Sequence, residues 1–181
     1  MGLRGKLAGS LLAVAATLAP AQMTAPRAPA VTMVAPPLVT IARGSRGNVP
    51  LDFRVVRGFH INSNMPHSEF LIPTALKFDA PTDIVIGKIT YPAGQDMSFP
   101  FAPDEKLNVY SGDFRILLTV HPLHTVVPAK YAFHGQLKYQ ACDNAQCYPP
   151  KQLPVNFEVK VAKGRSDSGR HNPAQSPHAH R

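Results

Sequence analysis

LPVNFEVKVA, residues 153 to 162, alternates apolar and polar side chains along most of its length. The apolar side chains lie on one face of the segment: Val155, Phe157, Val159 and Val161. Successive side chains of a β-strand point to opposite faces, so this period of two predicts a strand with one face in a core and the other in water. The stretch therefore indicates a β-protein, and the rest of the chain agrees with it.

Six further segments are rich in Val, Ile, Leu, Phe and Tyr and are separated by clusters of Gly, Pro, Asn and Asp, which favour turns. They are PLVTIARG (37–44), VPLDFRVV (49–56), TALKFDA (74–80), DIVIGKITYP (83–92), FRILLTVHP (114–122) and KYAFHGQLKYQAC (130–142). No segment carries the long apolar stripe of an amphipathic helix. Seven short strands with turns between them predict an all-β fold, an antiparallel β-sandwich.

The two ends of the chain differ in composition from this strand-rich part. Residues 1–21 combine a positive start, an apolar run of 13 residues and a small-residue cleavage site, which is typical of a secretory signal peptide. Residues 22–37 are rich in Ala and Pro and predict a linker, and residues 163–181 lack large apolar side chains and predict a disordered basic tail. We therefore expect one domain, residues 38–162, exported across the inner membrane to the periplasm without membrane insertion after signal removal.

The formal net charge of +8 is concentrated at the two ends of the chain. Residues 22–162 contain 13 Lys and Arg against 10 Asp and Glu, a net charge of only +3. Nucleic-acid binding needs a concentrated basic patch, and the domain sequence contains none. We therefore expect no nucleic-acid partner.

The chain has two cysteines, Cys142 and Cys147, within YQACDNAQCYPP (139–150). Two thiols of an exported protein tend to pair, because the compartment is oxidising. If the arms on either side of DNAQ (143–146) are antiparallel, the cysteines face each other with Cα atoms about 4.5 to 5.5 Å apart, close to what a disulfide needs. A bond at the tip of a loop is also accessible to the thiolate of another protein.

From the residues alone, three roles for the pair remain open: a redox-active disulfide, a structural clip of the hairpin, and a metal site. The loop between the cysteines is short, so closing it contributes roughly 2 kcal/mol of stabilisation, which is weak for a clip. Lys138 and Lys151 favour a thiolate and Asp143 opposes one, so the residues do not predict which cysteine attacks first.

Histidine and methionine patterns indicate no second site. We expect His60 to be a hydrogen-bonded residue at a strand end, with a catalytic or metal role as the alternative. The histidines on or beside strands lack the tight spacing of metal ligands, and the methionines are scattered. We therefore expect no metal and no cofactor.

Around the cysteines the chain resembles a known family. YQACDNAQCYPP resembles the active-site hairpin of the N-terminal periplasmic domain of the DsbD thiol:disulfide interchange reductase, with its Tyr-Gln-x-Cys start and Cys-Tyr-Pro-Pro finish. The segments that resemble other parts of the family are GFHINSNMP (58–66), FLIPTALKF (70–78), ITYP (89–92) and LNVYSGDFRILLTV (107–120). The resemblance spans nearly all of residues 38–162 and implies an immunoglobulin-like sandwich.

The resemblance also implies a function, that of a protein-disulfide reductase component. Cys142 and Cys147 match the two redox cysteines, and Tyr148, Pro149 and Pro150 match their flank. A membrane-embedded thiol reductase would reduce the pair, and the pair would then reduce thioredoxin-fold proteins. The reductase and the thioredoxin-fold proteins would be chains separate from this one. One cysteine would attack as a thiolate and the other would resolve the mixed disulfide. We expect the protein to be a monomer.

Two features depart from the family pattern. Four residues separate the cysteines, whereas the well-known member has five. Family members also shield the disulfide with a cap loop bearing acidic and aromatic residues, and the corresponding stretch MSFPFAPDEK (97–106) does not align cleanly with it. The candidate shielding residues in this stretch are Phe99, Phe101, Asp104 and Glu105.

Two alternative functions use the same residues differently. One is a non-catalytic β-sandwich binding module in which the disulfide of Cys142 and Cys147 only braces the hairpin. The other is a periplasmic copper carrier that uses both thiols and a neighbouring histidine. Loss of the fold on reduction would indicate the first, and Cu(I) binding that depends on both cysteines would indicate the second.

Overall fold

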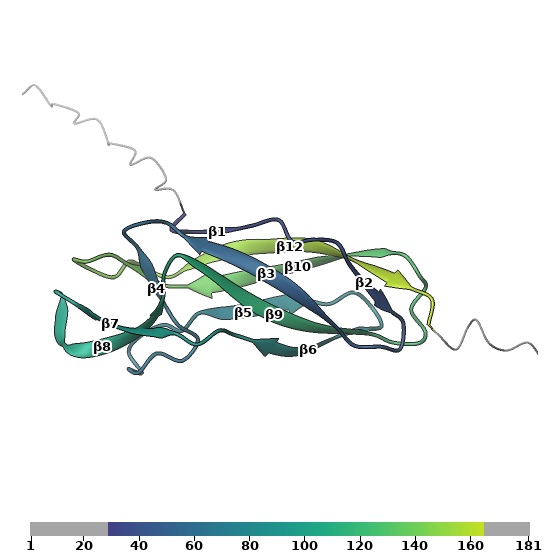
Figure 1. Cartoon of the computed structure of the whole chain (residues 1–181), viewed down its shortest axis with the longest axis horizontal. Coiled ribbons are helices and arrows are strands. Elements are labelled where there is room, and N and C mark those ends of the chain that lie inside the picture. Colours follow the sequence, from purple (N-terminus) through teal and green to yellow (C-terminus); the bar gives the residue numbers. More distant parts are fainter. Residues whose placement is uncertain (1–28, 165–181) are drawn as a thin grey trace, which may run out of the picture.

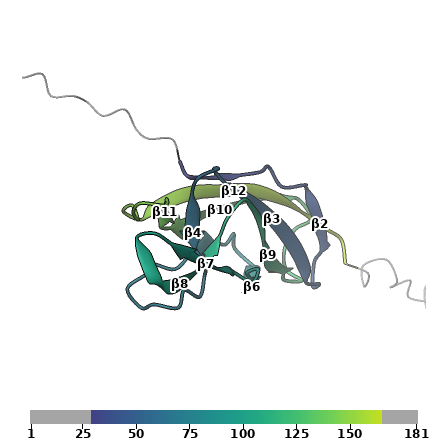
Figure 2. The same ribbon diagram turned by 60° about the vertical axis from the view of Figure 1, so that its left-hand side comes forward.

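The computed structural model describes residues 29–164, and within this range every regular element is a β-strand. The expected signal peptide, the first part of the linker and nearly all of the basic tail lie outside the described residues. The strands form two four-stranded sheets packed face to face and a third four-stranded sheet at one end of the sandwich (Figures 1 and 2).

The first sheet of the sandwich is antiparallel throughout. In spatial order its strands are β1 (Val31–Met33), β3 (Gly47–Val55), β9 (Asp113–Pro122) and β6 (Ile84–Thr90). The second sheet contains β2 (Val39–Ala42), β12 (Lys151–Ala162), β10 (Lys130–Tyr139) and β5 (Ala75–Asp79), and β2 runs parallel to β12. The strand alternation predicted for residues 153–162 is confirmed, because buried and exposed side chains alternate along β12.

The inner faces of the two sheets meet in one hydrophobic core. Phe53 and Phe114 stack within the first sheet with ring centroids 5.3 Å apart, and Phe133 and Phe157 stack within the second at 5.0 Å. Apolar faces buried between two sheets are the usual source of stability in such sandwiches. The all-β, immunoglobulin-like antiparallel sandwich expected for this chain is confirmed.

The third sheet consists of β11 (Ala141–Cys142), β4 (His60–Asn62), β8 (Ala102–Tyr110) and β7 (Gln95–Phe99), in that order. Among these strands, β7 and β8 form a hairpin over the segment where we expected a cap loop. Four of the five residues of β7 are exposed, so this hairpin lacks the regular apolar alternation that marked the core strands.

Two expectations about the elements are corrected. The segment 130–142 forms two strands, not one, because the chain changes sheets at Gln140: Tyr139 pairs with Lys151 of β12, whereas Ala141 pairs with Ile61 of β4. The Gln140 side chain stabilises the crossing, since its Oε1 accepts a hydrogen bond of 3.1 Å from Asn62.

The folded part also starts earlier than the expected boundary at residue 38. Val31–Met33, at the end of the predicted linker, pairs antiparallel with β3 as strand β1. Val31 is fully buried in this position, and its burial explains why the segment is ordered in spite of its Pro-rich surroundings.

Candidate functional site

Cys142, the last residue of β11, and Cys147 form a disulfide across the hairpin that follows β10. The backbone hydrogen bond from Tyr148 N to Ala141 O (2.8 Å) flanks the pair, so the cysteines occupy a non-hydrogen-bonded position of the ladder. Opposite Cα atoms approach most closely at such positions. The Cα–Cα distance is 3.9 Å. It is shorter than the value of about 4.5 to 5.5 Å that we expected.

Asp143 shapes the loop between the cysteines. Its Oδ1 accepts hydrogen bonds from the backbone N–H groups of Ala145 (2.8 Å) and Gln146 (2.9 Å), and its Oδ2 accepts the hydroxyl of Tyr148. Side chain-to-backbone bonds of this kind stabilise turns. We expected Asp143 to act only as a charge, and the structure shows that it also organises the loop.

The disulfide belongs to a row of side chains that crosses three neighbouring chain segments. His60 of β4 lies directly opposite Cys142 of β11, and Cys142 lies directly opposite Cys147. Side chains at directly opposite positions share one face, with Cβ atoms about 4.5 to 5.5 Å apart. Cys142 is fully buried and His60 is 3% exposed, whereas Cys147 is partly exposed. The row therefore runs from a buried histidine to an accessible cysteine.

The β7–β8 hairpin covers the buried end of this row. Phe99 stacks on His60 with ring centroids 3.8 Å apart, and Phe101 lies nearly parallel to Phe99 at 5.6 Å. The other two candidate shielding residues, Asp104 and Glu105, are exposed on β8, and their side chains form no hydrogen bond or ion pair within residues 29–164. The structure thus places the two phenylalanines against His60 and leaves the two carboxylates in solvent.

His60 is buried in an apolar setting, and its ring nitrogen Nε2 has no hydrogen-bond partner among the described residues. This corrects our expectation of a hydrogen-bonded histidine at a strand end. Burial lowers the pKa of His60 to about 4, and the charge of Asp143 opposes that shift. The imidazole is therefore neutral at neutral pH, and a neutral imidazole has one donor nitrogen and one acceptor nitrogen.

A mostly apolar pocket of about 200 Å³ lies beside the cysteine hairpin. Phe59, Tyr148, Pro149 and Pro150 contribute to its walls, and the rings of Phe59 and Tyr148 are tilted against each other with centroids 6.0 Å apart. The three residues that directly follow Cys147 therefore line this pocket together.

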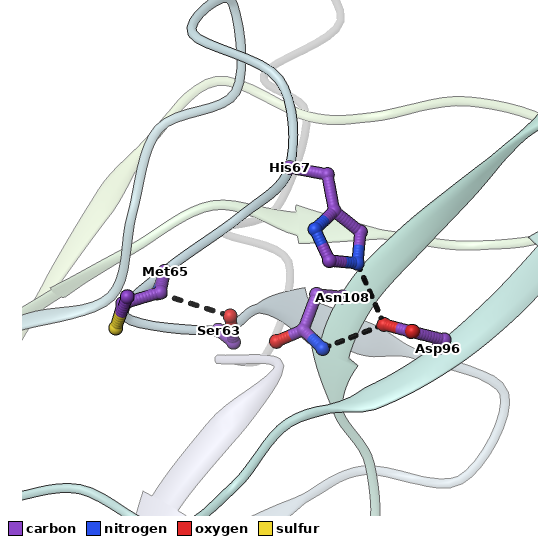
Figure 3. Close-up of polar contacts among 5 residues, drawn as sticks. All are labelled: Ser63, Met65, His67, Asp96 and Asn108. Atoms are coloured by element: carbon purple, nitrogen blue, oxygen red, sulfur yellow. Dashed lines mark hydrogen bonds and ion pairs between the residues drawn. The ribbon is translucent and has the colours of Figure 1, made fainter.

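A polar cluster ties the base of the β7–β8 hairpin to the loop after β4 (Figure 3). Asp96 Oδ1 of β7 accepts a hydrogen bond from Asn108 Nδ2 of β8 (2.7 Å) and lies 2.8 Å from His67 Nε2 of the loop. These two contacts, first Asn108 and then His67, lower the pKa of Asp96. At the start of the same loop, Met65 N donates to Ser63 Oγ (3.1 Å). The hairpin is thus anchored at its base as well as stacked on His60.

Within residues 29–164, and with the disulfide formed, no group of three or more His, Cys, Asp or Glu side chains is arranged to hold a metal ion. The same range contains no helix of the length and apolarity needed to cross a membrane.

A β-sandwich with a partly accessible disulfide at a hairpin tip is suited to thiol–disulfide interchange. The family model for the N-terminal part of thiol:disulfide interchange protein DsbD matches residues 30–158. The chain belongs to this family of DsbD N-terminal domains, and it is a thiol–disulfide interchange domain. The family resemblance expected from the cysteine hairpin is confirmed.

Solved structures similar to the chain come from several bacteria. The reduced DsbD N-terminal domain of Neisseria meningitidis is 20% identical, with 67% of this chain and 82% of that chain covered and a TM-score of 0.41. The complex of the DsbD and PilB N-terminal domains from the same organism gives 20% identity, coverages of 76% and 87%, and a TM-score of 0.40. The N-terminal periplasmic domain of ScsB from Proteus mirabilis is 12% identical, with coverages of 70% and 44% and a TM-score of 0.46. No curated protein matches the chain.

Proposed function

We propose that the chain is an exported, periplasmic protein-disulfide reductase component that relays electrons through Cys142 and Cys147. A membrane-embedded thiol reductase supplies the electrons, and thioredoxin-fold proteins receive them, all as separate chains. The observation that carries the proposal is a disulfide between a buried and a partly exposed cysteine, at the tip of a hairpin in a DsbD N-terminal family domain. Exchange requires that a thiolate can reach one sulfur of the bond.

The difference in exposure assigns different roles to the two cysteines in this proposal. A thiolate of the reductase attacks the sulfur of Cys147, the more exposed cysteine, and Cys142 leaves as a thiolate that takes up a proton. A second thiol of the reductase then releases Cys147 and leaves both cysteines reduced. When the reduced chain meets an acceptor, Cys147 attacks the acceptor's disulfide as a thiolate. Cys142 resolves the mixed disulfide, and the acceptor departs with both of its cysteines reduced.

The pocket beside the hairpin supports contact with a thioredoxin-fold acceptor. Tyr148, Pro149 and Pro150 directly follow Cys147, so an acceptor joined covalently to Cys147 must lie against this wall of the pocket. Apolar and aromatic surfaces are common at the centre of protein interfaces. In the same proposal, the Phe99 and Phe101 hairpin limits access to the buried end of the row.

The first test is the reduction potential of the Cys142–Cys147 bond, measured by equilibration in glutathione buffers with thiol trapping and mass analysis. A relay predicts a value between about −270 and −120 mV, the range of exchange proteins. A value below about −300 mV is typical of structural disulfides and would favour the binding module instead.

The second part of the test separates the roles of the cysteines. With an oxidised thioredoxin-fold protein, the reduced Cys142→Ala variant should accumulate a mixed disulfide through Cys147. The matched Cys147→Ala variant should accumulate little, because Cys142 is buried. Stoichiometric Cu(I) binding that both single variants weaken, without any mixed disulfide, would instead support the copper carrier.

A further inference from the structure

His60 is a buried titratable residue beside the cysteine pair, and the exchange steps above give it no role. Its side chain is 3% exposed, and no described residue forms a hydrogen bond with its Nε2. Buried polar atoms without a partner are destabilising and rare in native structures, so each one calls for an explanation. An aromatic side chain would fill the same space beside Phe99 without leaving a nitrogen unpaired.

Reduction of the disulfide changes the chemistry that faces His60. While the bond is intact, the Cys142 sulfur has no hydrogen to donate. In the reduced protein, Cys142 carries an S–H group, which is a hydrogen-bond donor. Cys142 is the residue directly opposite His60 in the β4–β11 ladder, so the new donor arises next to the imidazole, on the same face of the sheet.

We propose that His60 accepts the Cys142 S–H hydrogen bond in the reduced protein and serves as the base when Cys142 resolves a mixed disulfide. The proposal rests on the interchange function of the same cysteine pair. His60 is then a proton-transfer residue of the reaction. The substrate of this step is the mixed disulfide between Cys147 and a cysteine of the acceptor.

Resolution of the mixed disulfide consists of one proton transfer and one thiolate–disulfide exchange. His60 Nε2 takes the proton of Cys142, and the resulting thiolate attacks the Cys147 sulfur of the mixed disulfide. The bond between Cys147 and the acceptor breaks as the Cys142–Cys147 bond forms, and the acceptor sulfur leaves with the electron pair. The imidazolium then returns its proton to the departing thiolate or to solvent. The cysteine pair is oxidised by two electrons, and the acceptor is reduced by two.

Burial disfavours a positive charge on His60, and one charged neighbour offsets part of this cost. Asp143 in the cysteine loop is the charged group, among the described residues, whose field acts on His60, and it favours the protonated imidazole. The β7–β8 hairpin faces the ring with uncharged Phe99 and Phe101. Stacking on Phe99 holds the ring in place, and the proton source in this proposal is the Cys142 thiol. The same burial keeps the imidazole neutral, and thus able to accept a proton, before the reaction starts.

The test separates the two chemical steps with a small disulfide, so it needs no partner protein. The reduced protein is mixed with 5,5′-dithiobis(2-nitrobenzoate) in stopped flow. Attack by the first cysteine releases one thionitrobenzoate at a rate that depends on reagent concentration, and resolution by the second releases another at a rate that does not. We expect His60→Phe to change the first rate by less than about twofold. The second rate at pH 7 should fall tenfold or more, in line with the roughly 10²- to 10⁴-fold contributions of positioned bases.

The pH profile and a matched variant complete this test. In His60→Phe, the second rate should rise with pH as for an unassisted thiol of pKa about 8.5, whereas the unmodified protein should keep its rate at lower pH. His134→Phe, which replaces an exposed histidine on β10, should leave both rates unchanged. A second rate that is the same with and without His60 would overturn the proposal, even if the relay function holds. If the second rate falls in His60→Phe as expected, but the reduced protein transfers no electrons to thioredoxin-fold proteins, the relay function alone would be overturned.

A measurement on the unmodified protein covers the case in which His60→Phe does not fold. The pKa of the His60 ring is followed by NMR in the oxidised and the reduced protein. We expect reduction to lower this pKa further, because Cys142 is still a thiol at the pH where His60 titrates and its S–H hydrogen bond stabilises the neutral imidazole. An unchanged value would show that the Cys142 thiol does not interact with His60.

Discussion

Asp143 acts on the cysteine pair in two ways through a single carboxylate. Its Oδ1 holds the backbone N–H groups of Ala145 and Gln146, and its Oδ2 holds the hydroxyl of Tyr148. Its charge also raises the pKa of His60 against the larger effect of burial. The loop geometry and the electrostatics of the neighbouring histidine therefore depend on the same side chain, and two substitutions can separate them.

We expect Asp143→Ala to destabilise the oxidised protein by roughly 1 kcal/mol or more, because both N–H groups of the loop lose their acceptor. Asp143→Asn should cost less than about half of this, since an amide oxygen can still accept both bonds. Urea unfolding of the two variants at pH 7 measures the difference. Equal losses in both would mean that the charge, and not the turn geometry, is what the loop requires.

The individual residues of the site differ in how far the sequence predicts them. Cys142 and Cys147 are predictable as a pair, because they are close in sequence and an antiparallel hairpin brings them together. The place of His60 is not, because it follows from the pairing of β4 with β11, which joins segments about 80 residues apart. The missing hydrogen bond of His60 has no local sequence signal either, since it depends on what the β7–β8 hairpin buries.

The β7–β8 hairpin is held at both of its ends. Phe99 packs near its turn against His60, and Asp96 is bound at its base by Asn108 and His67. Between these points most side chains of β7 are exposed, so few apolar contacts stabilise the hairpin. We infer that the contacts of Asp96 control how often the β7–β8 hairpin opens.

Asp96→Ala should increase backbone hydrogen exchange in the β7–β8 hairpin by several-fold and leave β10 and β12 unaffected. Because the pKa of Asp96 is lowered from its ordinary value of 3.8, its stabilising effect is present above that value and is lost as the pH falls through the lower folded pKa. Protection of the hairpin in the unmodified protein should therefore decrease in that acidic range, and the variant should show no such decrease.

The control for this experiment is Asp104→Ala, because Asp104 is an exposed carboxylate of the same hairpin with no hydrogen bond or ion pair among residues 29–164. It should exchange like the unmodified protein. Faster exchange in both variants would indicate that net charge, rather than the Asp96 contacts, governs opening of the hairpin.

Except for β1, the strands of the core were predictable, whereas β4, β7 and β8 of the end sheet were not, for a physical reason. β12 buries one face, so burial imposes a period of two on its sequence, and β3 and β9 behave likewise. β4 has three residues, all buried, and β7 is almost entirely exposed, so neither shows an alternation. A cap loop over the disulfide was expected from family resemblance, whereas the β7–β8 hairpin found in this segment depends on tertiary pairing.

In the whole molecule, stability and chemistry occupy different places. The hydrophobic core lies between the two sheets of the sandwich, and the cysteine hairpin lies at the end that carries the third sheet (Figure 2). The disulfide joins residues only five positions apart, so it constrains little of the unfolded chain. We therefore expect the core to stay packed when the disulfide is reduced.

This separation predicts how reduction and core substitution differ in their effect on stability. Cys142→Ala with Cys147→Ala should lower the free energy of unfolding by roughly 2 kcal/mol, the value expected for so short a loop. Phe53→Ala should cost about 3 to 5 kcal/mol, because Phe53 is 1% exposed in the core and stacked on Phe114. Urea unfolding at pH 7 compares the two.

Reduced unmodified protein serves as the control, since it keeps both sulfur atoms and loses only the bond. If reduction alone destabilised the fold as much as Phe53→Ala, the bond would be a structural clip, because a relay must remain folded in both redox states.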